Sequence, residues 1–229
     1  MRMRLVLFDI DGTLLLTHGA GMRALNRAFS LNNVLPDAVK AVHPDGKTDP
    51  QIVREIMTLC GRDSECTSEM LAGFFNSYLS LLKEEMAICT QLRVMPGVRE
   101  LLARLAGEPD FCAGVATGNI EEGAWIKLHY ARLHSFFHFG GFGSDAEDRT
   151  EVIRQAITRG TALVAPRPVE AAFVIGDTPR DILHGKAAAA RTIAVATGTY
   201  SLESLRDHQP DLVVPTLEAI EPVMEVLRS

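Results

Sequence analysis

The stretch Leu5-Val6-Leu7-Phe8-Asp9-Ile10-Asp11-Gly12-Thr13 decides the fold, because an apolar run ends abruptly in two aspartates, a glycine and a threonine. The apolar run predicts a strand buried on both faces, as in a parallel sheet, and Gly12 predicts the turn that ends it. Ionised carboxylates at a buried strand end need a cation, a proton or solvent. The stretch also fits an Asp-Gly turn with a capping threonine, so its chemistry depends on the rest of the chain.

The two aspartates can divide the work of phosphoryl transfer. A carboxylate can attack phosphorus and form an aspartyl phosphate, and a second carboxyl group can protonate the leaving alcohol and later deprotonate water. We therefore assign nucleophilic attack to Asp9 and proton transfer to Asp11.

Size and composition restrict the class of protein. The chain has 229 residues, of which 47% are hydrophobic and 23% charged, as expected for one folded core with a smaller insertion. Its net charge is −6, and no dense block of Lys and Arg predicts a nucleic-acid partner. Asp9 and Asp11 interrupt the first apolar run too early for a signal peptide, and no run approaches the length of a membrane span. We expect a cytoplasmic protein without a membrane partner, either a monomer or a homodimer.

The periodicity of the chain predicts an α/β fold. Helical patterns occupy 21–29, 49–59 with Asp49 as N-cap, 68–86, 97–105, 119–132 with Asn119 at its start, and 149–159. Strand patterns occupy 111–116, 136–139, 171–175, 192–195 and 212–214, and a last helix starts near 217. Alternating strands and helices predict a doubly wound parallel sheet, formed by 1–15 and 90–229, and the strand-poor segment 16–89 predicts a helical insertion.

Polar residues follow the predicted strands at the edge where ligands bind in such sheets. Asp177 and Asp181 lie four residues apart at a strand-to-helix junction, and Asp9 with Asp177 offers the oxygen ligands that Mg²⁺ prefers. Thr117-Gly118-Asn119 offers a hydroxyl group and backbone amides to phosphate oxygens. Alone, each junction also fits ordinary helix capping. Their convergence favours one magnesium and phosphate site.

Three motifs occur in a fixed order along nearly the whole chain: Asp9-x-Asp11-Gly12-Thr13, then Thr117, then Gly176-Asp177-x-x-x-Asp181. This pattern resembles the haloacid dehalogenase superfamily, in its phosphatase branch with a helical cap, and is similar to the phosphoglycolate phosphatases. The resemblance implies a Rossmann-like core and a Mg²⁺ site formed by Asp9, the main-chain carbonyl of Asp11, Asp177 and the nearby Asp181. It also implies that Thr117 binds the transferring phosphoryl group. The acid at Asp11 looks like that of the phosphatases and mutases, which disfavours carbon–halogen cleavage.

The family normally carries a lysine some two dozen residues before the last motif, but no lysine occurs between Lys127 and Lys186. Arg149 is the best replacement, since a guanidinium binds phosphate in a bidentate manner. The same residue also fits an exposed arginine at a helix start, paired with a neighbouring acid. Substrate contacts are expected from residues beside the motifs and from one cap lysine, which also fits an ordinary exposed lysine: Gly12, Thr13, Gly118, Asn119 and Lys47.

These observations predict a Mg²⁺-dependent phosphomonoesterase that acts on a small phosphorylated metabolite through an aspartyl phosphate. A first alternative is a sugar-phosphate mutase similar to beta-phosphoglucomutase. Mutases of this family carry a histidine twelve places after the nucleophile, where this chain has Gly21. A second alternative, suggested by the missing lysine, is a noncatalytic phosphate-binding or regulatory protein.

Overall fold

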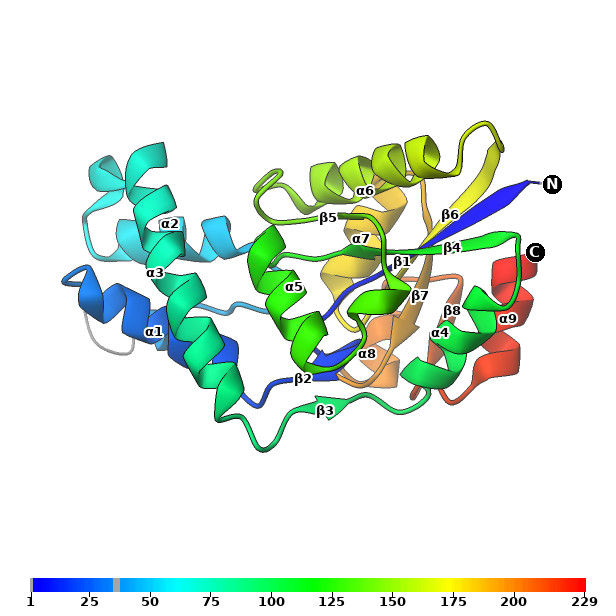
Figure 1. Cartoon of the computed structure of the whole chain (residues 1–229), viewed down its shortest axis with the longest axis horizontal. Coiled ribbons are helices and arrows are strands. Elements are labelled where there is room, and N and C mark those ends of the chain that lie inside the picture. The colour runs from blue at the N-terminus through cyan, green and yellow to red at the C-terminus, as the bar shows by residue number, and fades with distance from the viewer. Residues whose placement is uncertain (1, 35–37) are drawn as a thin grey trace.

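The computed structural model describes residues 2–34 and 38–229. A six-stranded parallel sheet carries helices on both faces, and a second group of helices lies beyond one end of its strands (Figure 1). In spatial order the strands are β5 (Gly140–Gly141), β4 (Phe111–Ala116), β1 (Met3–Phe8), β6 (Val169–Gly176), β7 (Arg191–Val195) and β8 (Leu212–Val214). The expected α/β doubly wound sheet with an inserted helical cap is confirmed.

The central strand β1 is buried because its side chains alternate between two apolar clusters. Val6 and Phe8 pack in the cluster that includes residues of α4 (Val98–Ala106), α5 (Glu121–Tyr130) and α9 (Ile220–Arg228). Leu5 and Leu7 pack on the other face with residues of α6 (Arg149–Val164). The remaining helices of the core are α7 (Pro179–Ala187) and α8 (Leu202–Arg206).

The register of the sheet brings the three motifs to one edge. Phe8, the last residue of β1, pairs with Val115 of β4 and with Ile175 of β6. Since all three strands run in the same direction, the residues that follow them emerge side by side. Asp9 therefore lies between the segments that carry Thr117 and Asp177.

In the part of the cap that the structure describes, three α-helices follow β1: α1 (Ala20–Leu31), α2 (Asp49–Leu59) and α3 (Ser68–Ala87), together with the short 3₁₀ helices η1 (Ala38–Ala41) and η2 (Asp63–Glu65). The three α-helices share an apolar cluster in which the rings of Phe29 and Phe74 lie 4.6 Å apart. Ile120 of the core joins this cluster, so the cap packs beside the segment that carries Thr117. The chain enters and leaves the cap through β2 (Leu15–Leu16) and β3 (Arg93–Val94), which pair antiparallel.

Three local expectations were wrong. Thr48, not Asp49, is the N-cap of α2, because its hydroxyl accepts a hydrogen bond from the amide of Gln51. Helix α5 begins at Glu121 rather than at Asn119, because the Asn119 side chain binds Asp11 and Thr117 instead of capping the helix. Residues 136–139 form no strand, since the 3₁₀ turn η3 (His134–Phe136) is followed by the two-residue strand β5.

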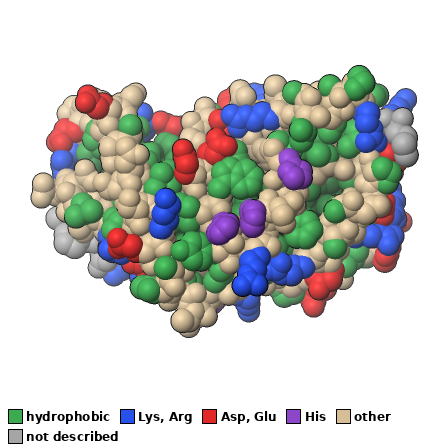
Figure 2. All heavy atoms as spheres, viewed as in Figure 1, with side chains coloured by type: hydrophobic (Ala, Val, Ile, Leu, Met, Phe, Trp, Pro, Cys, Tyr) green, Lys and Arg blue, Asp and Glu red, His purple; other side chains and the backbone are tan. Residues whose placement is uncertain are grey.

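Charged and apolar side chains share the surface of the described residues. On the face drawn in Figure 2, acidic and basic side chains are interspersed among apolar ones. The exposed large apolar residues Leu31, Ile88 and Leu163 lie on or beside three different helices. Within the described residues, no helix combines the length and apolar character needed to cross a bilayer.

Candidate active site

Asp9 follows β1 directly and is almost completely buried. Its Oδ1 lies 2.9 Å from Nη2 of Arg149. Burial raises the pKa of Asp9 to about 6, although the guanidinium of Arg149 acts in the opposite direction. The carboxylate needs more positive charge than Arg149 alone supplies.

Arg149 begins α6 and points inward, with 3% of its surface exposed. Its Nη2 also donates hydrogen bonds to Oδ1 of Asp181 at 2.7 Å and to the carbonyl of Ala116 at 3.2 Å. Burial opposes its charge, but Asp9 and Asp181 outweigh burial and raise the pKa of Arg149. The structure therefore places this guanidinium beside Asp9 and not at an exposed helix start.

The buried Nε of Arg149 has no hydrogen-bond partner among the described residues. An unpaired buried donor is costly, and such a group is typical of a site that receives a ligand. Because Arg149 lines the same cavity as Asp9 and Thr117, an anion bound there can satisfy the remaining donors of the guanidinium.

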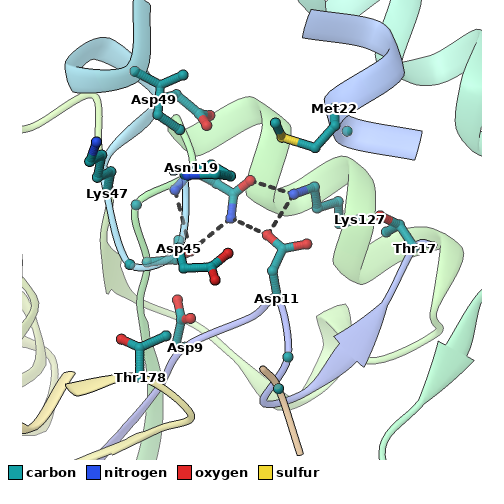
Figure 3. Close-up of a pocket in the computed structure, with 18 of the residues that line it drawn as sticks. Asp9, Asp11, Thr17, Met22, Asp45, Lys47, Asp49, Asn119, Lys127 and Thr178 are labelled. Atoms are coloured by element: carbon teal, nitrogen blue, oxygen red, sulfur yellow. Dashed lines mark hydrogen bonds and ion pairs between the residues drawn. The ribbon is translucent and has the colours of Figure 1, made fainter. Parts of the chain in front are cut away.

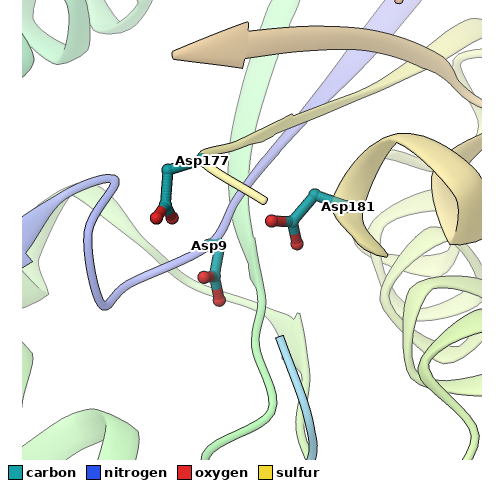
Figure 4. A group of neighbouring side chains, drawn as sticks. All are labelled: Asp9, Asp177 and Asp181. Carbon is teal, nitrogen blue, oxygen red and sulfur yellow. The ribbon is translucent and has the colours of Figure 1, made fainter. Parts of the chain in front are cut away.

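Asp9, Asp177 and Asp181 form an acidic cluster, with one oxygen of each within 4.8 Å of the others (Figure 4). Burial, and then the neighbouring carboxylates, raise the pKa of Asp177 well above its usual value. The hydroxyl of Thr13 donates to Oδ1 of Asp177 at 2.9 Å. The expectation that Thr13 contacts the substrate is not supported, because Thr13 is fully buried, does not line the cavity and orients Asp177.

The donor set fits a hard divalent cation. Asp9 and Asp177 present buried carboxylate oxygens with too few positive partners, and oxygen ligands of this kind suit Mg²⁺. Asp181 differs, because its oxygens already accept hydrogen bonds from Arg149 and from the amide and hydroxyl of Thr178. Asp9 and Asp177 would hold the ion, and Asp181 supports Arg149 beside it.

The turn after β1 depends on Gly12. Its φ is +85°, a conformation that other residues rarely adopt, and a Cβ at this position would lie 2.3 Å from Oδ2 of Asp177. Gly12 lines the cavity but offers no side chain to a substrate. Its role in this structure is to let the Asp11 loop approach Asp177.

The Thr117-Gly118-Asn119 segment faces the cavity at the end of β4. Oγ1 of Thr117 accepts a hydrogen bond from Nδ2 of Asn119 at 2.8 Å. A Cβ on Gly118 would lie 2.0 Å from the carbonyl oxygen of Lys47, so glycine allows the cap loop to close over this segment. Lys47 lines the cavity, and its ammonium is paired with Glu55.

Asp49 joins the cap to the same core segment. Its backbone amide donates to the carbonyl of Gly118 at 2.7 Å, and its Oδ2 accepts from the amide of Ile120 at 2.9 Å. Burial raises the pKa of Asp49 to about 6, against the attraction of the ammonium of Lys127. The cap is thus closed on the core at α2.

Lys127 is a member of the site that sequence reasoning missed. It lies on α5, only 5% exposed, and its ammonium binds both Asp11 and Asn119 (Figure 3). Little in the sequence indicated this role, since Asn119 lies before the first residue of α5 and Asp11 is 116 residues away from Lys127. These groups, with Met22, Leu25, Ile52 and Tyr78 of the cap, enclose a cavity of about 320 Å³.

Comparisons with known proteins agree with this architecture. The model of the haloacid dehalogenase-like hydrolases matches residues 6–195. The probable phosphatase IndB of Dickeya dadantii (strain 3937) is 26% identical over 221 residues, which cover 94% of this chain and 91% of that protein. A phosphoglycolate phosphatase of Agrobacterium fabrum (strain C58 / ATCC 33970) is 24% identical, covering 96% of this chain and 91% of that protein.

A solved structure from Bacteroides vulgatus with beta-phosphoglucomutase in its description superimposes with a TM-score of 0.70. The identity is 20%, and the alignment covers 99% of this chain and 89% of that chain. At this identity the similarity shows the fold alone.

Proposed function

The chain belongs to the haloacid dehalogenase-like hydrolases and is a phosphatase-type hydrolase, and from this premise we propose a Mg²⁺-dependent phosphomonoesterase that acts on a small phosphorylated metabolite. The observation that carries the proposal is the position of Asp9. Its carboxylate lies in the cavity between the cation of Arg149 and the carboxylate of Asp177, where a phosphate ester and a divalent ion would meet it.

The proposed reaction has two in-line transfers. Asp9 attacks phosphorus, the bond from phosphorus to the leaving oxygen breaks, and Asp11 donates a proton to that oxygen. Asp11 then takes a proton from water, whose oxygen attacks the phosphoryl group and releases Asp9. Mg²⁺ held by Asp9 and Asp177 would neutralise charge between the carboxylates and the phosphate.

The phosphoryl group would be held by donors that surround Asp9. Thr117 and Gly118 line the cavity beside it, and the guanidinium of Arg149, whose Nε is unpaired, lies next to Gly118. Arg149 also keeps Asp9 ionised, which a nucleophilic carboxylate requires. In this proposal Arg149 takes the place of the lysine that the family usually has.

The size of the cavity supports a small substrate. About 320 Å³ is enclosed between cap and core, enough for a phosphate ester with a short leaving group but not for a macromolecule. The cap wall combines apolar contacts from Met22 and Ile52 with the hydroxyl of Tyr78 and the carboxyl group of Asp49. Closure of the cap would exclude bulk water while the phosphoenzyme forms.

A mutase is the second candidate, favoured by the fold shared with the protein from Bacteroides vulgatus. Gly21 argues against it, because this position lacks the histidine that the mutases carry. The products decide between the two. A mutase would yield a phosphorylated isomer with little free phosphate, whereas the phosphatase releases phosphate.

The test is a panel of small phosphate esters incubated with wild type and with Asp9→Asn, in Mg²⁺ and in EDTA. We expect phosphate release that needs Mg²⁺ and is abolished by Asp9→Asn, because an amide cannot replace the nucleophilic carboxylate. Equal rates in both proteins, or no turnover of any ester, would refute the proposal. A protein that binds phosphate without turnover would instead support the noncatalytic alternative.

A further inference from the structure

The ammonium of Lys127 is the only cation within hydrogen-bond distance of Asp11 among the described residues. Nζ lies 2.6 Å from Oδ2 of Asp11 and 2.6 Å from Oδ1 of Asn119. Nδ2 of Asn119 donates to the same Oδ2 of Asp11 at 2.8 Å. The three side chains thus form a closed triangle of hydrogen bonds that holds one oxygen of Asp11 from two directions (Figure 3).

Asp11 needs such partners to have a defined position. Its side chain is 43% exposed, on the turn that follows β1, so without them the carboxylate could rotate into water. Lys127 and Asn119 both belong to the core and not to the cap, since they lie on or just before α5. With Oδ2 engaged, Oδ1 of Asp11 has no hydrogen-bond partner among the described residues and is free for a substrate oxygen.

Gly21 gives Lys127 the space that it occupies. A Cβ at this position in the first turn of α1 would lie 3.3 Å from Nζ and 3.4 Å from Cε of Lys127. Glycine weakens a helix relative to alanine, so its presence here needs a local reason. Close approach of the ammonium supplies that reason.

We propose that Lys127 is a positioning residue, which fixes Oδ2 of Asp11 so that Oδ1 can exchange a proton with the leaving oxygen. The assignment rests on the proposed phosphatase function. This role of Lys127 also explains why position 21 is a glycine. The mutases have a histidine at this position, whereas here the space beside Gly21 is occupied by the side chain of Lys127 from the core.

The test compares two kinds of ester, because an alkoxide must be protonated as it leaves whereas p-nitrophenolate is stable without a proton. For Lys127→Met we expect kcat/KM on glycerol 2-phosphate to fall by about 100-fold and on p-nitrophenyl phosphate by less than about 5-fold. Lys127→Arg, which keeps the charge, should recover part of the loss on the alkyl ester. Lys83→Met removes an exposed lysine of α3 and should change neither rate.

Two further measurements separate positioning from a general structural role. In an Asp11→Asn background, Lys127→Met should cause no additional loss on the alkyl ester, since the group that it positions is already gone. A crystal structure of Lys127→Met should show the Asp11 carboxylate displaced. Should Lys127→Met not fold, Lys127→Gln takes its place in both assays.

The proposal fails if both esters lose rate equally, if neither does, or if Asp11 keeps its position without the lysine. Failure of the phosphatase proposal itself looks different. In that case Asp9→Asn and wild type behave alike on every ester, and the crystal structure alone decides whether Lys127 fixes Asp11.

Discussion

Nη2 of Arg149 lies 2.9 Å from Oδ1 of Asp9. The guanidinium reaches the carboxylate from the first turn of α6 and is held there by Oδ1 of Asp181, whose Oδ2 accepts hydrogen bonds from the amide and hydroxyl of Thr178. Removing one partner of an ion pair buried this deeply leaves the other charge uncompensated. A substitution at Arg149 should therefore lower both the stability and the turnover of the protein.

For Arg149→Met we expect the free energy of unfolding to fall by about 3–5 kcal/mol at neutral pH in EDTA, since Asp9 and Asp181 lose their cation. Mg²⁺ should restore part of this loss. Phosphatase activity should fall by about 1000-fold, and Arg149→Lys should retain more of it, because an ammonium keeps the charge but not the fork of donors. Denaturant unfolding and ester kinetics measure the two effects. A methionine variant with wild-type activity would remove Arg149 from the site.

Asp177 is expected to control the affinity for magnesium. Asp177→Asn removes a charged oxygen from the cluster, so the Mg²⁺ concentration for half-maximal activity should rise by at least about 10-fold. Asp110→Asn is the matched control, because Asp110 forms a surface ion pair with Arg167 far from this cluster. Activation curves against Mg²⁺ provide the measurement. If the two variants require the same Mg²⁺ concentration, Asp177 is not a ligand.

The pKa of Asp49 gives a prediction for stability against pH. Burial raises this pKa from 3.8 to about 6, so between these values the folded protein binds more protons than the unfolded chain. The stability that the protonated carboxyl group of Asp49 contributes is therefore fully present below pH 3.8 and is lost as the pH rises through about 6. Asparagine does not titrate. The free energy of unfolding of Asp49→Asn should therefore rise by roughly 2 kcal/mol relative to that of wild type as the pH goes from 4 to 7. Denaturant unfolding in Mg²⁺ at both pH values tests this, and an unchanged difference between the proteins would contradict it.

Much of the sheet could be predicted from the sequence because burial on both faces leaves a strong mark. The run before Asp9 and the run before Gly176 are apolar at consecutive positions, and the two strands end at Phe8 and at Gly176. Strand β5 shows no such apolar pattern in the sequence, since it has only two residues, both glycines. There the neighbouring β4 determines the conformation, not the local sequence.

The positions of long polar side chains in the fold were harder to predict from the sequence. Arg149 at a helix start fits solvent as well as a buried site, and only the packing of α6 against the sheet decides between them. Lys127 was missed because its partner Asp11 lies 116 residues away in the chain. The role of Lys127 depends on contacts between segments that are distant in the sequence, and hydrophobic periodicity does not reveal such contacts.

Gly118 offers a test of cap closure that replaces no charged residue. A Cβ at this position would lie 2.0 Å from the carbonyl oxygen of Lys47, which requires the cap loop to shift, and 3.1 Å from Nη1 of Arg149. Gly118→Ala should therefore lower kcat/KM by more than about 10-fold, because an open cap admits water and misplaces the leaving group.

Gly73→Ala is the control for the glycine substitution itself, since an added Cβ there meets nothing within 4 Å on helix α3. It should stabilise the cap by about 0.5–1 kcal/mol through helix propensity and leave turnover unchanged. Thermal unfolding and ester kinetics on both variants separate the two effects. If Gly118→Ala turns over substrate as wild type does, closure of the loop at Lys47 is not needed for the reaction, and the contact between Asp49 and Ile120 only stabilises the fold.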